Sequence, residues 1–177
     1  LHHPKAANQT FLASDGNGVD IANMTIGRGE LSGNNSTTHG YVTAGAPADS
    51  RNVTIDKFTF AAAADATDVG DLTIGRSNTS GASSTTYGYV MSGYTAASLR
   101  NTIDKYSFSS DGNATDSGDL TSAKSNGTGV SSSTHGYHAG GSPHTDVIEK
   151  FSWASEGNTV DVGDLTTAKY TPAGQQY

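Results

Sequence analysis

The chain has 177 residues, enough to bury a core, but only 33% are hydrophobic and 15% charged, so it fits neither an ordinary globular domain nor a highly charged disordered chain. There is no cysteine, which excludes a disulfide framework and any thiolate nucleophile or metal site. The net charge of −7, without a Lys/Arg cluster, argues against nucleic acid, and no apolar run is long enough to span a membrane.

Helix-forming residues are scarce, whereas turn-forming and β-branched residues abound, with 22 Gly, 23 Thr and 22 Ser. This composition predicts an all-β fold with less than about 10% helix, against an average near a third. The start, Leu1 to Lys5, has no initiator methionine and no signal-peptide pattern, and we interpret it as an internal start. We expect residues 1–177 to form a single repeat domain.

Self-similar segments recur along the chain. Segment 54–60, TIDKFTF, returns as 102–108, TIDKYSF, and as 147–153, VIEKFSW, at spacings of 48 and 45 residues. Each continues into Asp-x-Gly-Asp-Leu-Thr and a basic residue, at Arg76, Lys124 and Lys169, and a degenerate early copy is followed by Arg28. After Arg28, Arg76 and Lys124, a Ser/Thr/Gly-rich tract leads into Gly-Tyr. The pattern predicts a partial repeat at 1–32, repeats at about 33–80 and 81–128, and an incomplete last repeat at 129–177.

Each repeat is expected to contain four short strands. The Gly-Tyr, Ile-Asp-Lys and Asp-Leu-Thr segments alternate as strands do, and the Ser/Thr tract supplies the fourth. Asp111-Gly112-Asn113 is typical of a hairpin turn, because glycine adopts positive φ freely. The aromatic and leucine positions of these strands are expected to form the core between repeats: Phe58, Phe60, Tyr106, Phe108, Phe151, Trp153, Leu72, Leu120 and Leu165.

A unit of four strands in 45–48 residues has the size of a propeller blade. The Gly-Tyr-Val strand that ends in glycine, at Gly45, Gly93 and Gly140-Gly141, resembles the aromatic-to-diglycine strand of Kelch-type repeats, the type also seen in galactose oxidase. The resemblance implies Kelch-like β-propeller blades. The alternative architecture is a β-solenoid or a trimeric β-fibre, in which repeats stack along an axis.

The sequence departs from the Kelch pattern in two ways: only Gly140-Gly141 keeps both glycines, and the expected tryptophan is replaced near Asp68, Asp116 and Asp161. The Tyr–Cys crosslink of copper radical oxidases cannot form without cysteine. The repeats also resemble Gly/Thr-rich repeats in tail and other virion proteins of marine phages. Closing a ring would require further repeats of a longer chain or another copy.

Two groups of residues are candidate metal ligands. The acidic turn with Asp111, Asp116 and Asp119 could offer oxygens to calcium, but it lacks the Asp-x-Asp-x-Asp-Gly spacing, and a structural turn is favoured. His135 and His138 form the best histidine pair, with His144 near them, yet strand packing is favoured there too. We therefore expect no cofactor and no required metal.

No residue that could be catalytic breaks the repeat, which favours a non-enzymatic protein. We expect an exposed structural or receptor-recognition part of a virion, such as a tail fibre, located in the virion or outside cells. Its expected partners are other virion proteins, further repeats and host surface glycans, with oligomers giving multivalent binding. The rivals are a secreted propeller enzyme acting on carbohydrate and a cellular Kelch-type scaffold. The expected contacts lie in variable loops, at Asp49, Tyr94, His144 and Thr145.

Overall fold

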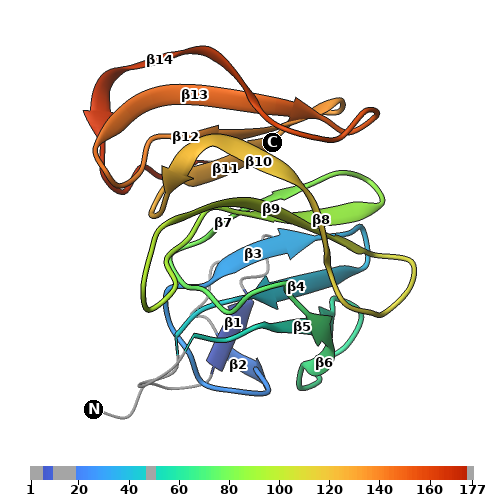
Figure 1. Ribbon diagram of the computed structural model, residues 1–177. Coiled ribbons are helices and arrows are strands. Elements are labelled where there is room, and N and C mark those ends of the chain that lie inside the picture. Colours follow the sequence, from blue (N-terminus) through green and yellow to red (C-terminus); the bar gives the residue numbers. More distant parts are fainter. Residues whose placement is uncertain (1–5, 10–18, 47–50, 175–177) are drawn as a thin grey trace.

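The computed structural model describes residues 6–9, 19–46 and 51–174, which form fourteen β-strands and no helix. The all-β prediction is confirmed for this part of the chain. It contains no helix that is long and apolar enough to cross a membrane. Figure 1 shows the sheets following one another, from the N-terminal strands at the bottom to β14 at the top.

The strands form one two-stranded sheet and three four-stranded sheets. The small sheet pairs β1 (Ala6–Gln9) with β2 (Val19–Asn23). The first large sheet contains β3 (Ser32–Asn35), β4 (His39–Thr43), β5 (Thr54–Thr59) and β6 (Thr67–Asp71). The second contains β7 (Ser80–Ser83), β8 (Tyr87–Met91), β9 (Arg100–Ser107) and β10 (Thr115–Lys124). The third contains β11 (Thr128–Ser131), β12 (His135–Ala139), β13 (Thr145–Ser152) and β14 (Val160–Lys169).

Each large sheet is an antiparallel meander in which consecutive strands are neighbours. The register between the first two strands is the same each time, with Asn35, Ser83 and Ser131 opposite the glycine of the Gly-Tyr strand. The four-strand repeat unit is therefore confirmed, including the strand expected from the Ser/Thr tract. The sheets do not close into a barrel or ring within the described residues.

The first strands of the sheets, β3, β7 and β11, lie against one another. Glycine makes this approach possible, because a Cβ at Gly81 would collide with the carbonyl of Gly33, and one at Gly129 with the carbonyl of Gly81. The side-chain amide of Asn34 also donates a hydrogen bond to the Ala82 carbonyl at 2.6 Å. The turns that follow these first strands are therefore held close together.

Aromatic side chains pack between consecutive sheets. Tyr41 of the first sheet stacks on Phe108 of the second, with ring centroids 4.8 Å apart. Tyr89 of the second sheet stacks on Trp153 of the third at the same 4.8 Å separation. The expected core positions Tyr106, Phe151, Leu72 and Leu120 are buried, and Phe108 and Trp153 are half-buried.

Two parts of the expected core are wrong. Phe60 is 41% exposed and Phe58 only half-buried, although both carry the pattern of their counterparts. The reason is that, among the described residues, the sheet before theirs consists of β1 and β2 and supplies no Gly-Tyr strand to pack against them. Leu165 is only half-buried, because no described sheet covers β14.

A buried ion pair joins each four-stranded sheet to the strand that precedes it, β2, β6 or β10. The basic residue ends or follows that strand and meets an acid on the third strand of the next sheet, where both side chains are almost fully buried. The pairs are Arg28–Asp56 at 3.2 Å, Arg76–Asp104 at 3.0 Å and Lys124–Glu149 at 2.5 Å. Asp111 and Glu156 of the acidic turns pair with Lys57 and Lys105, which lie on the third strands.

Candidate functional site

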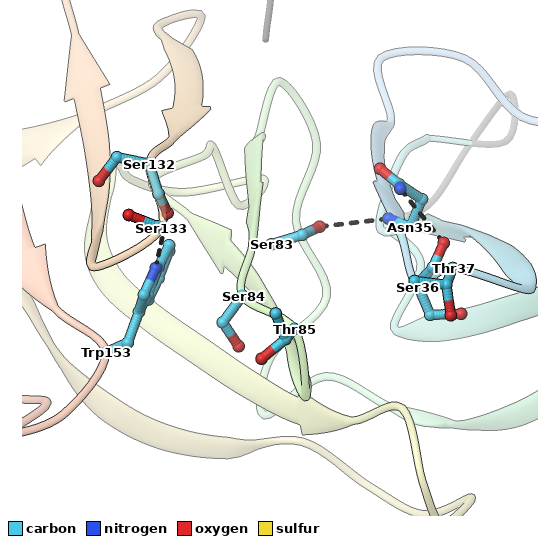
Figure 2. A pocket seen from close by; sticks show the side chains of 9 residues that line it. All are labelled: Asn35, Ser36, Thr37, Ser83, Ser84, Thr85, Ser132, Ser133 and Trp153. Carbon is cyan, nitrogen blue, oxygen red and sulfur yellow. Dashed lines mark hydrogen bonds between the residues drawn. The ribbon is translucent and has the colours of Figure 1, made fainter. Parts of the chain in front are cut away.

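A hollow of about 250 Å³ opens where the turns after β3, β7 and β11 come together. We call it the three-turn hollow. Figure 2 shows its lining, which consists of the last residues of β3 and β7, two residues from each of the three turns, and one tryptophan: Asn35, Ser83, Ser36, Thr37, Ser84, Thr85, Ser132, Ser133 and Trp153. Residues about 48 positions apart in sequence thus meet at one place.

The serine that begins each turn fixes its shape. The Ser36 hydroxyl accepts hydrogen bonds from the Thr38 and His39 amides, at 3.3 and 3.0 Å. Ser84 and Ser132 repeat these two contacts with the same distances. Such side-chain-to-backbone bonds are typical of serine in tight turns, so the repeated sequence produces three superimposable turns.

The hydroxyl of the second residue of each turn has no hydrogen-bond partner among the described residues. Thr37, Thr85 and Ser133 are exposed, and their hydroxyls make no hydrogen bond to any described residue. A threonine or serine hydroxyl can donate one hydrogen bond and accept two. The three-turn hollow therefore presents three equivalent hydroxyls that are free to bind a ligand.

Trp153 forms the aromatic side of the hollow. Its indole N–H donates to the Ser132 carbonyl at 3.0 Å, and its ring stacks on Tyr89 and meets Phe151 edge-on. These contacts fix the ring while leaving it only half-buried, with part of its surface open to the hollow. A fixed, partly exposed indole supplies apolar contact beside the polar turns.

The chemistry of the hollow is polar and neutral. None of its lining residues carries a charge, and Asn35 and Ser83 are linked by a hydrogen bond from the Asn35 amide to the Ser83 hydroxyl at 3.2 Å. Without a charged or titratable side chain, the lining offers no acid, base or ionic nucleophile. It suits a neutral ligand rich in hydroxyl groups.

The contact residues expected from the sequence lie elsewhere. Tyr94 is half-buried with its ring under the Arg51 guanidinium, His144 is exposed beside Tyr170, and Thr145 begins β13. Asp49 lies outside the described residues. The loops that carry them follow β8 and β12, whereas the three turns precede these strands, so the two sets lie at opposite strand ends. These loop contacts stay a prediction, separate from the hollow.

The candidate metal ligands are dispersed. In the part of the chain that the structure describes, no group of three or more His, Asp or Glu side chains is placed to hold a metal ion. Asp111 pairs with Lys57, and Asp116 accepts a hydrogen bond from the Gly118 amide at 3.0 Å. The Asp119 amide donates to Asn158 at 3.0 Å, and the His135 ring is 2.8 Å from the Thr134 hydroxyl.

His138 is fully buried next to the Lys124–Glu149 pair. Burial lowers its pKa to about 4, against the attraction of Glu149 3.9 Å away and with the added repulsion of Lys124. Burial alone would raise the pKa of Glu149, but hydrogen bonds from Lys124, Thr159 and the Thr121 amide lower it. His138 is thus a neutral core residue at pH 7, in the position that Val42 and Val90 hold in the other sheets.

Sequence reasoning missed the lining residues of the hollow, because it treated the Ser/Thr tract as strand alone. The available signal was the Ser-Thr, Ser-Thr and Ser-Ser pair before Thr38, Thr86 and Thr134. No protein-family model matches the chain, and the comparison with curated proteins gives no significant match.

Proposed function

We propose that this protein is a non-enzymatic recognition and structural protein, an exposed virion part such as a tail fibre, that binds a neutral surface glycan in the three-turn hollow. The observation that carries the proposal is the convergence of three free hydroxyls, on Thr37, Thr85 and Ser133, beside the Trp153 ring. Hydroxyls and an aromatic surface complement the polar edges and apolar faces of sugars. The virion setting is supported by the resemblance of the repeats to phage tail proteins.

The framework around the hollow also supports a binding role. The turns rest on first strands held by glycine contacts, and each sheet is anchored by one buried ion pair. We propose that these sheets are Kelch-like blades, arranged around the line of first strands β3, β7 and β11. In such an arrangement the turns form one end of the repeat array, where equivalent groups contact one ligand.

Affinity is expected to be modest for a single copy. Each hydroxyl hydrogen bond contributes about 0.5–1.5 kcal/mol net. Three such bonds and partial contact with one indole give a weak site, so useful binding to a cell surface would come from several copies acting together. A glycan array probed with monomeric and streptavidin-multimerised protein tests this expectation, and equal binding by both forms would contradict it.

Variants separate the hollow from the loops at the other strand ends. The combined variant Thr37→Val, Thr85→Val and Ser133→Ala should weaken binding of the best array glycan at least roughly tenfold, the loss of about 1.4 kcal/mol. The matched control, Ser98→Ala with His144→Ala, removes exposed polar groups at the opposite strand ends and should leave binding unchanged. If the control loses binding and the hollow variant keeps it, the site lies in the loops. Glycan cleavage by the unaltered protein would contradict the non-enzymatic assignment.

A further inference from the structure

The fourth strand of a sheet presents a fixed set of groups to the sheet that follows it. In β10 the Ser117 carbonyl accepts a hydrogen bond from the Gly157 amide at 2.9 Å. The Asp119 amide donates to the Asn158 side chain at 3.0 Å, and the Asp119 carbonyl accepts from the Thr159 amide at 2.9 Å. The third sheet is therefore attached to β10 through backbone groups of alternate residues.

The same bonds attach the second sheet to β6. The Val69 carbonyl accepts from the Gly112 amide at 2.8 Å, and the Asp71 amide donates to the Asn113 side chain at 3.0 Å. The Asp71 carbonyl accepts from the Ala114 amide at 2.8 Å. Because two interfaces repeat the same bonds at the same positions, the pattern belongs to the repeat.

The acid of the next sheet completes each interface. Asp104 accepts from the Thr73 amide at 3.0 Å as well as from Arg76, and Glu149 accepts from the Thr121 amide at 2.7 Å as well as from Lys124. Lys124 is 1% exposed as a result. A buried carboxylate on the third strand is thus a required part of the partner.

Strand β14 carries the same groups without their partners. The Val162 carbonyl and the Asp164 and Thr166 amides take the positions of Ser117, Asp119 and Thr121, yet no other sheet of the described chain bonds to them. Lys169, at the position of Lys124, is exposed and forms no ion pair with a described residue. Val160 and Val162 are 56% and 44% exposed.

The glycines of the fourth strands give a second, independent observation that β14 has an open face. A Cβ at Gly70 or at Gly118 would collide with the turn backbone of the following sheet, whereas at the equivalent Gly163 nothing lies within 4 Å. Farther along, Gly174 lies against Thr128 and Val130 of β11, five residues after Lys169. Gly129, five residues after Lys124, lies against β7 in the same manner.

We propose that the open face of β14 is the docking site for one more four-stranded sheet of this repeat, joined in tandem after Gly174 and carrying a carboxylate at the position of Glu149. The tandem source follows from Gly174, which lies against Thr128 and Val130 of β11 as Gly129 at the start of the third sheet lies against Gly81 of β7. A carboxylate is expected in the additional sheet because Lys169 is exposed, whereas its counterpart Lys124 is buried in an ion pair with Glu149. This inference does not depend on the proposed glycan ligand.

An extended chain tests the proposal. Residues 130–177 are appended after Gly174, which places a second copy of Glu149 opposite Lys169. Hydrogen exchange of the Asp164 and Thr166 amides is measured in the original and extended chains, with the Asp119 and Thr121 amides as internal reference. The Asp164 and Thr166 amides should slow at least roughly a hundredfold and approach the reference pair. A second extension with residues 82–128, which supplies Asp104, guards against failure of one appended copy to fold.

Thermal melts complete the test. Lys169→Ala should lower the melting temperature of the extended chain by several degrees and leave that of the original chain unchanged. Glu149→Gln in the appended copy should remove this sensitivity to Lys169→Ala. Unchanged exchange at Asp164 and Thr166 in both extensions overturns the proposal. Protection that rises with concentration in the original chain also overturns it, because β14 would then bind a second copy.

Discussion

Strands β10 and β14 have closely related sequences but different surroundings. In β10, Leu120 and Lys124 are buried under the sheet that follows. In β14, the equivalent Leu165 is half-buried and Lys169 exposed, since no described sheet follows. The comparison shows that burial of these positions is a property of the interface between two sheets, and that a strand of this repeat buries its inward residues only when the next sheet is present.

The largest expected effect comes from removing a buried interface cation, Arg76, which follows β6 at the position of Lys124, and comparing it with the exposed Lys169 of β14. Arg76→Ala leaves the Asp104 carboxylate buried and unpaired, and should lower the free energy of unfolding by about 3–5 kcal/mol. Lys169→Ala removes an exposed charge and should change it by less than about 0.5 kcal/mol. Denaturant unfolding of both variants measures the difference.

A conservative control variant sharpens this result. Arg76→Lys keeps the charge and should lose less stability than Arg76→Ala. Equal losses for Arg76→Ala and Lys169→Ala would show that burial in an ion pair does not distinguish an interface cation from the exposed Lys169, and would contradict the comparison.

The second prediction concerns acid stability, where the second and third sheets differ at one core position. His138 of the third sheet replaces Val90 of the second, and burial lowers its pKa from 6.5 to about 4. Below pH 6.5 the unfolded chain binds a proton that the folded chain does not, so stability falls as the pH drops toward 4, and above pH 6.5 the effect is absent. Between pH 8 and pH 5 this loss amounts to about 2 kcal/mol.

The variant His138→Val should remove that loss, whatever its effect at neutral pH. Unfolding free energies at pH 8, 7, 6 and 5 measure the slope, and this range stays above the lowered pKa of Glu149. An unaltered slope in His138→Val would mean that His138 binds protons equally in the folded and unfolded chains, and that burial does not lower its pKa.

Local sequence signals were sufficient to predict where the strands lie, but not which of their side chains a neighbouring sheet buries. Alternation in 102–108 correctly placed Tyr106 and Phe108 on one face, because strand geometry depends only on neighbouring residues. The same alternation in 54–60 gave the wrong burial for Phe60, because burial there depends on a sheet that precedes it. The sequence does not show which acid meets Arg76, since Asp104 lies 28 residues away and several carboxylates are nearer.

The site was harder to predict for a related reason. Each Ser/Thr turn is recognisable by itself, but a hollow exists only because three turns separated by about 48 residues are stacked by glycine contacts between first strands. The sequence predicts ligand contacts in the variable loops because these loops differ between repeats. The turns of the hollow are instead built from residues that recur, so differences between repeats do not indicate it.

The smallest expected effect is a gain in stability at the end of the Gly-Tyr strand. The residue before the glycine that follows the Gly-Tyr strand has positive φ in every four-stranded sheet, 61° at Ala44, 60° at Ser92 and 65° at Gly140, yet only the third sheet has glycine there. Ser92 is also fully buried, and its hydroxyl has no hydrogen-bond partner. Ser92→Gly removes the backbone strain and the unpaired hydroxyl, and both changes stabilise the folded chain. The greater conformational entropy of glycine in the unfolded chain opposes this gain. We expect a net gain of about 1 kcal/mol, or roughly 2–4 °C in the melting temperature. Ala44 has the same positive φ but no hydroxyl, so Ala44→Gly should gain less stability than Ser92→Gly. Gly140→Ser should lose stability. If Ser92→Gly lowers the melting temperature, the second and third sheets do not share this backbone conformation in solution.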